Sequence, residues 1–215
     1  MTEFEQFWLK IDDKARILSL SNSKAVSKVI DNSISFTYSL PQYESTKIIC
    51  KNINEGSKVL VLASWTSLTL LEMLYQDGKT KEVTLLDHDR SVISVGDQIQ
   101  SFYPNMNIKY VRKNVVFDDI SEYLIDPDVI VIPSINMLLQ FDELLPNLRK
   151  DTLISITGTS NMKMRYGNPI YNVDDLKSQI TCNEVLFAKQ YNSSWGVNNV
   201  PNMFKFITSV VVARI

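Results

Sequence analysis

The hydrophobic pattern of the chain is clearest over Ser57–Asp89. Lys58–Leu62 is a near-continuous apolar run, of the kind found in a strand that is buried on both faces. Leu68–Tyr75 continues with apolar residues suited to a buried helix, and Glu82–Leu86 repeats the strand pattern. This stretch therefore predicts a strand, a helix and a second strand, joined by two turns.

The alternation of strands and helices continues to Gly158, which is expected to mark a turn. We expect helices over Ser91–Phe102 and Met137–Leu148. The further expected strands are Asn107–Arg112, Asp128–Ile132 and Thr152–Thr157. Strands that alternate with helices at this spacing are typical of a parallel sheet covered on both faces.

The pattern changes near the end of the chain. Val173–Ile180 is expected to be a short helix with Asn172 as its N-cap. Glu184–Gln190 and Met203–Ile215 are expected to be strands, and the Asn- and Ser-rich segment Tyr191–Asn202 is expected to be a loop between them. Two strands joined without a helix pair antiparallel or lie apart in the sheet. The pattern therefore favours a last strand that runs against the others.

Residues 1–56 are expected to form a helical segment ahead of the sheet domain at 57–215. Its first apolar residues recur at helical spacing, and a later helix is expected over Ser45–Ile53. The segment between, around Pro41, is expected to be extended or turning. The whole segment is a candidate lid or cap. Its Tyr38 and Tyr43 either line a ligand mouth or cover the edge of the core.

Composition and charge narrow the class of protein. The chain has 215 residues, of which 45% are hydrophobic, so it can bury one substantial core. The net charge is -2 and the Lys and Arg residues are scattered, which argues against a broad nucleic-acid surface. No segment approaches the roughly 18 apolar residues of a membrane span, and the amino terminus lacks a signal-peptide pattern. A soluble, cytoplasmic protein is expected.

Metal and disulfide chemistry are not expected. Cys50 and Cys182 lie far apart without a CxxC pattern, which favours two reduced thiols over a disulfide or a metal site. His88 is the single histidine, whereas ordinary zinc sites need several Cys or His ligands.

Asp87 is the first candidate for binding a ligand. It ends the second strand, about twenty residues beyond the first turn, where an acid accepts hydrogen bonds from a ribose. The alternative is that Asp87 or Asp89 caps a helix that begins near Ser91. His88 lies between these acids, which favours its protonated form if they are close. It is either a general base or an exposed turn residue.

The strand order, the acid after the second strand and the closing pair of strands resemble the class I S-adenosylmethionine-dependent methyltransferase fold over about Ser45–Ile215. The resemblance implies an α/β, Rossmann-like, doubly wound seven-stranded sheet, mostly parallel with an antiparallel last strand and with helices on both faces. It places Val61 where an acid is usual. It places Ala63, Trp65 and Ser67 at three customary glycine positions.

The resemblance also implies S-adenosylmethionine as the cofactor. Asp87 matches the ribose-binding acid of the family, Asn114 falls near the residue that contacts the adenine amino group, and Ile132–Asn136 occupies the fourth motif. Because the family's glycines let the backbone approach the cofactor, Trp65 either blocks the methionine end of the pocket or rotates out. The residues expected to bind the cofactor are Ala63, Ser64, Trp65, Asp87, His88, Asn114 and Ser134.

The fourth motif argues against methylation of DNA bases. Pro133–Asn136 lacks the second proline and the aromatic residue used on exocyclic amines, and neither cysteine follows a proline, as base-carbon methylation requires. The residues expected to contact substrate are on loops that follow strand ends. They are Asn136, Trp195 and Asn198.

Three functions remain open. The preferred one is a divergent S-adenosylmethionine-dependent methyltransferase that acts on a small-molecule or protein substrate, with proximity supplying much of the catalysis and no catalytic residue assigned. The second is a methyltransferase-like domain without cofactor, acting as a binding or assembly module, in keeping with the lost glycines. The third is an enzyme that binds another nucleotide through Asp87. The oligomeric state is not predicted.

Overall fold

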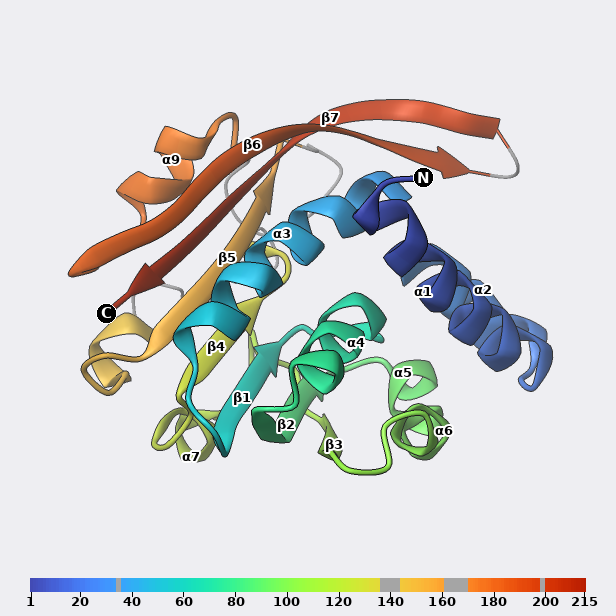
Figure 1. Ribbon diagram of the computed structural model, residues 1–215, viewed down its shortest axis with the longest axis horizontal. Helices are drawn as coiled ribbons and strands as arrows, with labels where there is room; N and C mark the ends of the chain where they lie inside the picture. Colours follow the sequence, from blue (N-terminus) through green and yellow to red (C-terminus); the bar gives the residue numbers. More distant parts are fainter. Residues whose placement is uncertain (34–35, 136–143, 161–169, 198–199) are drawn as a thin grey trace.

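The computed structural model contains one seven-stranded sheet in the order β3-β2-β1-β4-β5-β7-β6 (Figure 1). The residues that the structure describes are 1–33, 36–135, 144–160, 170–197 and 200–215. The strands are β1 Ser57–Leu62, β2 Thr80–Asp87, β3 Asn107–Arg112, β4 Val129–Ile132, β5 Leu153–Thr159, β6 Glu184–Val197 and β7 Val200–Arg214. The helices are α1 Glu3–Leu20, α2 Lys24–Ser33, α3 Phe36–Asn52, α4 Leu68–Asp77, α5 Arg90–Ser94, α6 Gly96–Ser101, α7 Ser121–Leu124 and α9 Val173–Ser178, with a 3-10 turn η2 at Leu145–Asn147.

The directions of the strands confirm the predicted sheet. β1 pairs parallel with β2 and β4, β2 pairs parallel with β3, and β4 pairs parallel with β5. β7 alone runs antiparallel to its neighbours, β5 and β6. The fold is therefore the expected mostly parallel α/β sheet with an antiparallel last strand.

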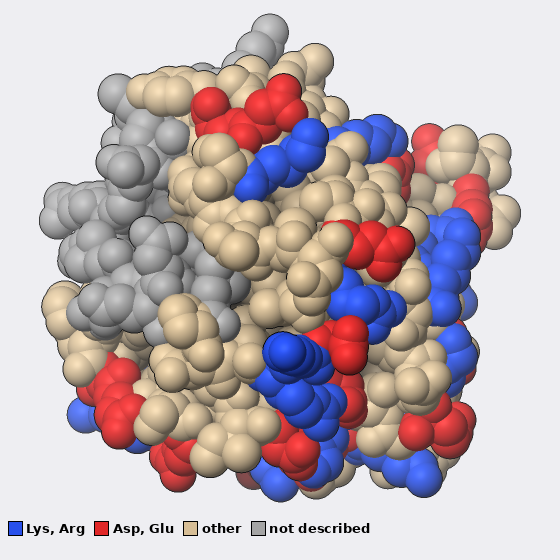
Figure 2. Space-filling view, turned by 90° about the vertical axis from the view of Figure 1, so that its left-hand side faces the viewer, with Lys and Arg blue, Asp and Glu red and all other residues tan. Residues whose placement is uncertain are grey.

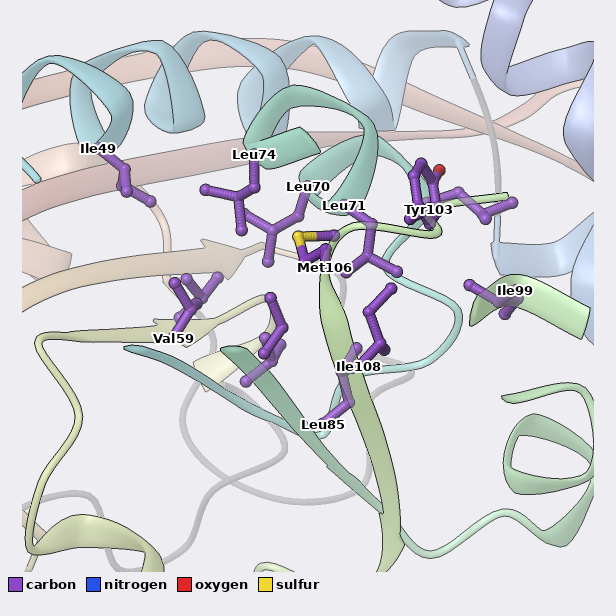
Figure 3. Packing of buried hydrophobic residues seen from close by; sticks show 14 of the residues in the cluster. Ile49, Val59, Leu70, Leu71, Leu74, Leu85, Ile99, Tyr103, Met106 and Ile108 are labelled. Atoms are coloured by element: carbon purple, nitrogen blue, oxygen red, sulfur yellow. The ribbon is translucent and has the colours of Figure 1, made fainter. Parts of the chain in front are cut away.

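Helices cover both faces of the sheet and form two hydrophobic clusters. In Figure 3, Leu71 and Leu74 of α4 approach Val59, Leu85 and Ile108 of the strands, and all five residues belong to one buried cluster. A second cluster on the opposite face joins strand residues to α7 and α9. Complete burial of a leucine or isoleucine side chain contributes about 1.5–3 kcal/mol to the stability of the fold. The alternation of apolar residues along each strand therefore determines which face of that strand packs against which helices.

The amino-terminal helices pack on the same face as α4. Thr2 and Glu5 form a capping box at the start of α1. The ring of Tyr43 in α3 lies 5.1 Å from the Phe4 ring and 4.9 Å from the Phe7 ring, and Tyr43 is buried. Tyr43 therefore covers the core, while the side chain of Tyr38 lies outside the described residues. The role of this segment as a lid stays a prediction.

The expectation of an extended segment around Pro41 was wrong. α3 begins at Phe36 and includes Pro41. Proline in a helix removes one backbone hydrogen bond and costs about 3 kcal/mol. Packing outweighs this cost because Ser39 and Tyr43, on either side of the proline, are both buried in the fold.

The expected turn at Gly158 was also wrong, because β5 continues to Thr159. A Cβ atom at Gly158 would lie 2.6 Å from Cγ1 of Ile170 and 3.2 Å from Cγ2 of Ile135. The glycine is therefore needed for close packing against a neighbouring segment and not for a turn.

The predicted loop at Tyr191–Asn202 was wrong as well. β6 extends to Val197 and β7 begins at Val200, and the two strands form a long hairpin that continues past the end of β5 (Figure 1). One of the polar residues that suggested a loop, Ser193, is bonded across the ladder, since its Oγ accepts from Oγ1 of Thr208 at 2.8 Å.

The remaining helix predictions had mixed outcomes. The helix expected over Ser91–Phe102 is divided at Val95 into α5 and α6. Asn172 is the N-cap of α9, as predicted, and its side chain accepts from the backbone of Asp174 and Asp175. Most of the helix expected over Met137–Leu148 lies outside the described residues.

Candidate functional site

The loops that follow the parallel strands meet at one edge of the sheet. Leu62 and Leu86, the last apolar residues of β1 and β2, are partners in the parallel ladder. The loop Ala63–Ser67 therefore begins beside Asp87, and the segment after β4 begins on the other side of β1. In open α/β sheets, ligands bind at this carboxyl edge.

The loop Ala63–Ser67 has an alternating left-handed backbone. The φ angles are 54° at Ala63, 48° at Trp65 and 48° at Ser67. Each non-glycine residue in this region costs roughly 1–2 kcal/mol. These are the same three positions at which the resemblance places glycine, so the loop keeps the backbone conformation of a glycine motif without its glycines.

The carboxylate of Asp87 holds this loop. Its Oδ2 accepts from the backbone N–H of Trp65 at 2.8 Å, and its Oδ1 accepts from the backbone N–H of Asp89 at 2.9 Å. The side chain is only 2% exposed. The backbone N–H of Ser64 adds a bond of 3.1 Å to the carbonyl of Leu86. Asp87 thus ties the first loop to the end of β2.

The capping alternative applies to the other acid. Oδ1 of Asp89 accepts from the backbone N–H of Ser91 at 2.7 Å, which caps α5. Asp87 is therefore not the N-cap of that helix, and its expected role toward a ribose stays a prediction.

Two side chains beside Asp87 reach the surface. The Trp65 residue is 37% exposed, so its indole is partly in solvent and not buried in the core. His88 is exposed, and its Nδ1 lies 3.6 Å from Oδ1 of Asp87. The imidazole is therefore accessible next to a buried carboxylate.

Asn114 lies just beyond β3, where it shapes a turn. Its Oδ1 accepts from the backbone N–H of Val116 at 3.1 Å, and its own N–H donates to Oδ2 of Asp118 at 2.7 Å. Side-chain bonds of this kind stabilise local turns. Asn114 stays a predicted cofactor contact, as does Ser134, which is buried after β4.

The three predicted substrate contacts are placed only in part. Asn136 and Asn198 lie outside the described residues. The backbone of Trp195 lies in β6 opposite Phe204, but its side chain is outside the described residues. Their expected contact with a substrate therefore stays a prediction.

A narrow cleft opens beside the first loop, between α3 and the sheet. Its lining comes from α3, the loop, α4, β4 with the segment that follows it, and the middle of β5. The residues are Gln42, Ser45, Thr46, Ser67, Leu70, Val131, Pro133, Ser155 and Thr157. The space open to the centre of a water molecule measures about 10 Å³, which accommodates roughly one water.

The sequence reasoning did not single out Gln42 or Ser155 as parts of this cleft. A signal was present in β5, whose sequence LISITGT places Ser155 and Thr157 two residues apart among apolar neighbours. Residues at that spacing lie on one face of a strand. The contribution of α3 was missed because its first turns were predicted to be extended.

α3, which lines one side of the cleft, is bonded to β6 of the β6–β7 hairpin. Oε2 of Glu44 accepts from Nζ of Lys189 at 2.7 Å and from the hydroxyl of Tyr191 at 2.6 Å. Burial alone would raise the pKa of Glu44, but the hydrogen bonds from Lys189 and Tyr191 outweigh it and lower the pKa. Glu44 is therefore ionised at neutral pH and fixes α3 against β6.

Charges of both signs mix on the surface. On the face in Figure 2, Lys and Arg side chains lie next to Asp and Glu and form no extended patch of one sign. Opposite charges also pair among the described residues, as in the 2.5 Å contact between Arg149 and Asp128. The described residues on the face in Figure 2 show no extended basic patch, and the expected lack of a broad nucleic-acid surface stays a prediction.

The described residues contain neither a cluster of metal ligands nor a helix suited to cross a membrane. No group of three or more His, Cys, Asp or Glu there could hold a metal ion. Within the same residues, no helix is long and apolar enough to cross a membrane. Cys50 and Cys182 are free thiols, and burial raises the pKa of Cys50 to about 12, which makes it unreactive.

Several solved structures resemble this chain in fold. An rRNA methylase from Streptococcus thermophilus aligns with a TM-score of 0.52 and 13% identity over 81% of this chain and 96% of that chain. The [4+2]-cyclase SpnF aligns with a TM-score of 0.53 and 8% identity over 80% of each chain. A putative methyltransferase complexed with SAH aligns with a TM-score of 0.50 and 16% identity over 80% of this chain and 49% of its own.

The likeness lies in the structure and not in the sequence. No family model and no curated protein matches the sequence. At such low identities the alignments establish the fold, and the cyclase illustrates that one fold accommodates different reactions.

Proposed function

We propose that this chain, which has the fold of the class I S-adenosylmethionine-dependent methyltransferases, binds S-adenosylmethionine at the carboxyl edge of its sheet. The proposal includes transfer of the methyl group to a small-molecule or protein substrate. The observation that carries it is the left-handed backbone at Ala63, Trp65 and Ser67. A chain that had lost all use for this loop would be free to relax it, because the conformation is costly for these residues.

The residues at this edge fit the nucleoside half of the cofactor in part. Each oxygen of Asp87 accepts one backbone N–H and keeps capacity for another donor, such as a ribose hydroxyl. Asn114 follows β3, the neighbour of β2, and Ser134 follows β4, the neighbour of β1. His88 is next to the carboxylate at the surface.

The methionine half fits less well in the present conformation. Val61 is fully buried and supplies no acid, and the cleft beside Ser67 accommodates roughly one water. The cleft offers hydroxyls from Ser155 and Thr157 as polar contacts. Binding therefore requires the cleft to widen.

The chemistry needs few catalytic groups. When bound, the cofactor supplies a methyl group on a sulfonium. A nucleophile of the substrate would take this methyl group and lose its proton to solvent, and S-adenosylhomocysteine would remain with the electron pair of the broken carbon–sulfur bond. Holding the two reactants in line can supply most of the acceleration. The proposed substrate contacts are Asn136, Trp195 and Asn198.

Calorimetric titration with S-adenosylmethionine and S-adenosylhomocysteine tests the proposal. We expect saturable heat and a rise in melting temperature, since a ligand at about 100 times its Kd stabilises the folded state by about 2.7 kcal/mol. Asp87→Asn should weaken binding by about tenfold or more through loss of a charged acceptor. Glu82→Gln, on the same strand, is the matched control and should bind as the wild type does.

Absence of heat and of any thermal shift at ligand concentrations of about 1 mM would contradict the proposal, since even a Kd of 1 mM corresponds to roughly 4 kcal/mol of binding. The cofactor-free binding or assembly module would then be the better account. Binding of other adenine nucleotides, with none of S-adenosylmethionine, would also contradict it and favour a different nucleotide enzyme.

A further inference from the structure

A hydrogen bond to the loop Ala63–Ser67 comes from a residue outside β1 and β2. The hydroxyl of Tyr110 donates to the carbonyl of Thr66 at 2.9 Å. Thr66 lies between Trp65 and Ser67, two of the left-handed residues. This hydrogen bond therefore acts on the Thr66–Ser67 peptide, which lies between the two left-handed residues.

Tyr110 reaches the loop from the edge of the sheet. It lies in β3, where its ladder partner is Leu85 of β2, and β1 lies beyond β2 in the sheet order. The tyrosine side chain thus extends past a whole strand to meet the loop that follows β1. A tyrosine side chain is long enough to reach across β2, whereas a serine or threonine hydroxyl would remain beside β3.

Gly96 leaves room for the tyrosine ring. A Cβ atom at Gly96 would lie 2.9 Å from Cδ2 of Tyr110 and 3.2 Å from both its Cβ and Cγ. Contacts this close to the Cβ and Cγ atoms of a side chain cannot be relieved by a small rotation of its outer atoms. Gly96 is at the start of α6, directly after the break at Val95. The interruption of the predicted helix therefore coincides with the space that Tyr110 occupies.

The hydroxyl of Tyr110 remains a donor across the working range of pH. Burial, with a smaller effect from the negative charge of Asp87, raises the pKa of Tyr110 above that of a free tyrosine. The protonated hydroxyl is the form that can donate to a carbonyl. The support of Thr66 is therefore expected to be independent of pH near neutrality.

We propose that Tyr110 is a positioning residue of the candidate nucleoside site, that it holds the loop Ala63–Ser67 through the Thr66 carbonyl, and that Gly96 admits its ring. Asp87 accepts from the N–H of the Ser64–Trp65 peptide, and Tyr110 donates to the carbonyl of the Thr66–Ser67 peptide, two peptides further along the loop. The consequence for ligand binding rests on the proposed function, whereas the consequence for the loop itself does not.

Tyr110→Phe tests the proposal, with Tyr103→Phe as the matched control. Tyr103 is fully buried on the same face of the sheet, and its hydroxyl has no hydrogen-bond partner in the part of the chain that the structure describes (Figure 3). Each variant removes one buried hydroxyl, but only the first touches the loop. The first readout is hydrogen exchange in the ligand-free protein at the Ser64 and Trp65 amides, which are bonded to Leu86 and Asp87.

We expect Tyr110→Phe to speed exchange at these amides by about 3- to 10-fold, the effect of losing one hydrogen bond. Tyr103→Phe should leave them unchanged. The second readout is titration with S-adenosylhomocysteine, for which Tyr110→Phe should raise Kd by about the same factor. Unchanged exchange in Tyr110→Phe would overturn the proposal, as would equal acceleration in both variants.

The two proposals fail in different ways. Faster exchange in Tyr110→Phe, together with no binding of S-adenosylhomocysteine by the wild type, would support positioning of the loop while contradicting the proposed function. Faster exchange with an unchanged Kd would overturn the positioning role in binding. If Tyr110→Phe does not fold, Gly96→Ala provides the same exchange readout, because the added methyl displaces the ring without removing the hydroxyl.

Discussion

Left-handed backbone occurs in the turns at Gly56 and Gly78 and also in the loop Ala63–Ser67. The two glycines have φ angles of 82° and 75°, and a Cβ atom at either position would meet nothing within 4 Å. In the loop, three residues with side chains have φ angles between 48° and 54°. The chain therefore uses glycine where the backbone angle is the only requirement and omits it at the candidate site.

This difference shows that two sources of order produce the same backbone angle. At Gly78, which ends α4, local preference is sufficient, because glycine enters the left-handed region at little cost. In the loop, a hydrogen bond accepted by Asp87 and one donated by Tyr110 stabilise the conformation against local preference. Asp151 is intermediate, since it has a φ of 70° and belongs to a residue type that tolerates this region.

Removing the carboxylate that holds the loop should cause the largest loss of stability. Asp87→Ala removes the acceptor of the partly buried N–H groups of Trp65 and Asp89. Hydrogen bonds to charged groups are worth about 1.5–3 kcal/mol, so we expect a loss of about 3 kcal/mol in the free energy of unfolding. Urea denaturation at neutral pH measures it.

Asp89→Ala is the control for the same segment, because it removes only the N-cap of α5. Its expected cost is about 1 kcal/mol. If Asp87→Ala costs no more than Asp89→Ala, contacts from Asp87 do not determine the loop, and the contrast with the glycine turns would be lost.

Gly158→Ala tests a third use of glycine, in which space and not backbone angle is limiting. Overpacking of this kind costs typically 1–3 kcal/mol, and we expect about 2 kcal/mol, because the new methyl would meet Ile170 at 2.6 Å. Denaturation of Gly158→Ala, Ile170→Ala and the double variant gives the coupling between the sites. A double variant whose loss equals the sum of the single losses would show that the clash with Ile170 is not the cause.

The sequence predicted the parallel half of the sheet well for a physical reason. Strands buried on both faces, such as Lys58–Leu62 and Asp128–Ile132, differ in composition from everything around them, and both were placed to within one residue. The errors occurred where distant contacts override local preference. Pro41 is tolerated because its helix packs on the core, and the polar segment after Tyr191 forms a strand because β7 pairs with it.

The segments that form the site could be predicted from the sequence, but the hydrogen bonds between them could not. Strand order was enough to expect Asp87 beside the loop after β1. That its carboxylate binds the amide of Trp65 depends on a left-handed backbone at a tryptophan, which no sequence preference suggests. The support from Tyr110 depends on clearance at Gly96, a contact between residues on different elements.

Gly78→Ala measures the local side of the comparison. The added methyl meets no atom, so any loss comes from the backbone angle alone. We expect a loss of about 1–2 kcal/mol in the free energy of unfolding, measured by urea denaturation, because alanine is strained at this φ. A loss near zero would show that the turn at the end of α4 can relax without cost, and glycine would then not be required there.

Ala63→Gly makes the reverse change in the loop and should have the smallest effect, with the opposite sign. Glycine relieves roughly 1–2 kcal/mol of strain but adds about 0.5–1 kcal/mol of entropy to the unfolded chain, so a net gain of about 0.5–1 kcal/mol is expected. Denaturation of this variant beside Gly78→Ala gives the two halves of one comparison. A loss of stability in Ala63→Gly would mean that the methyl group of Ala63 makes contacts worth more than its strain. The loop would then be held by its own side chains as well as by Asp87 and Tyr110.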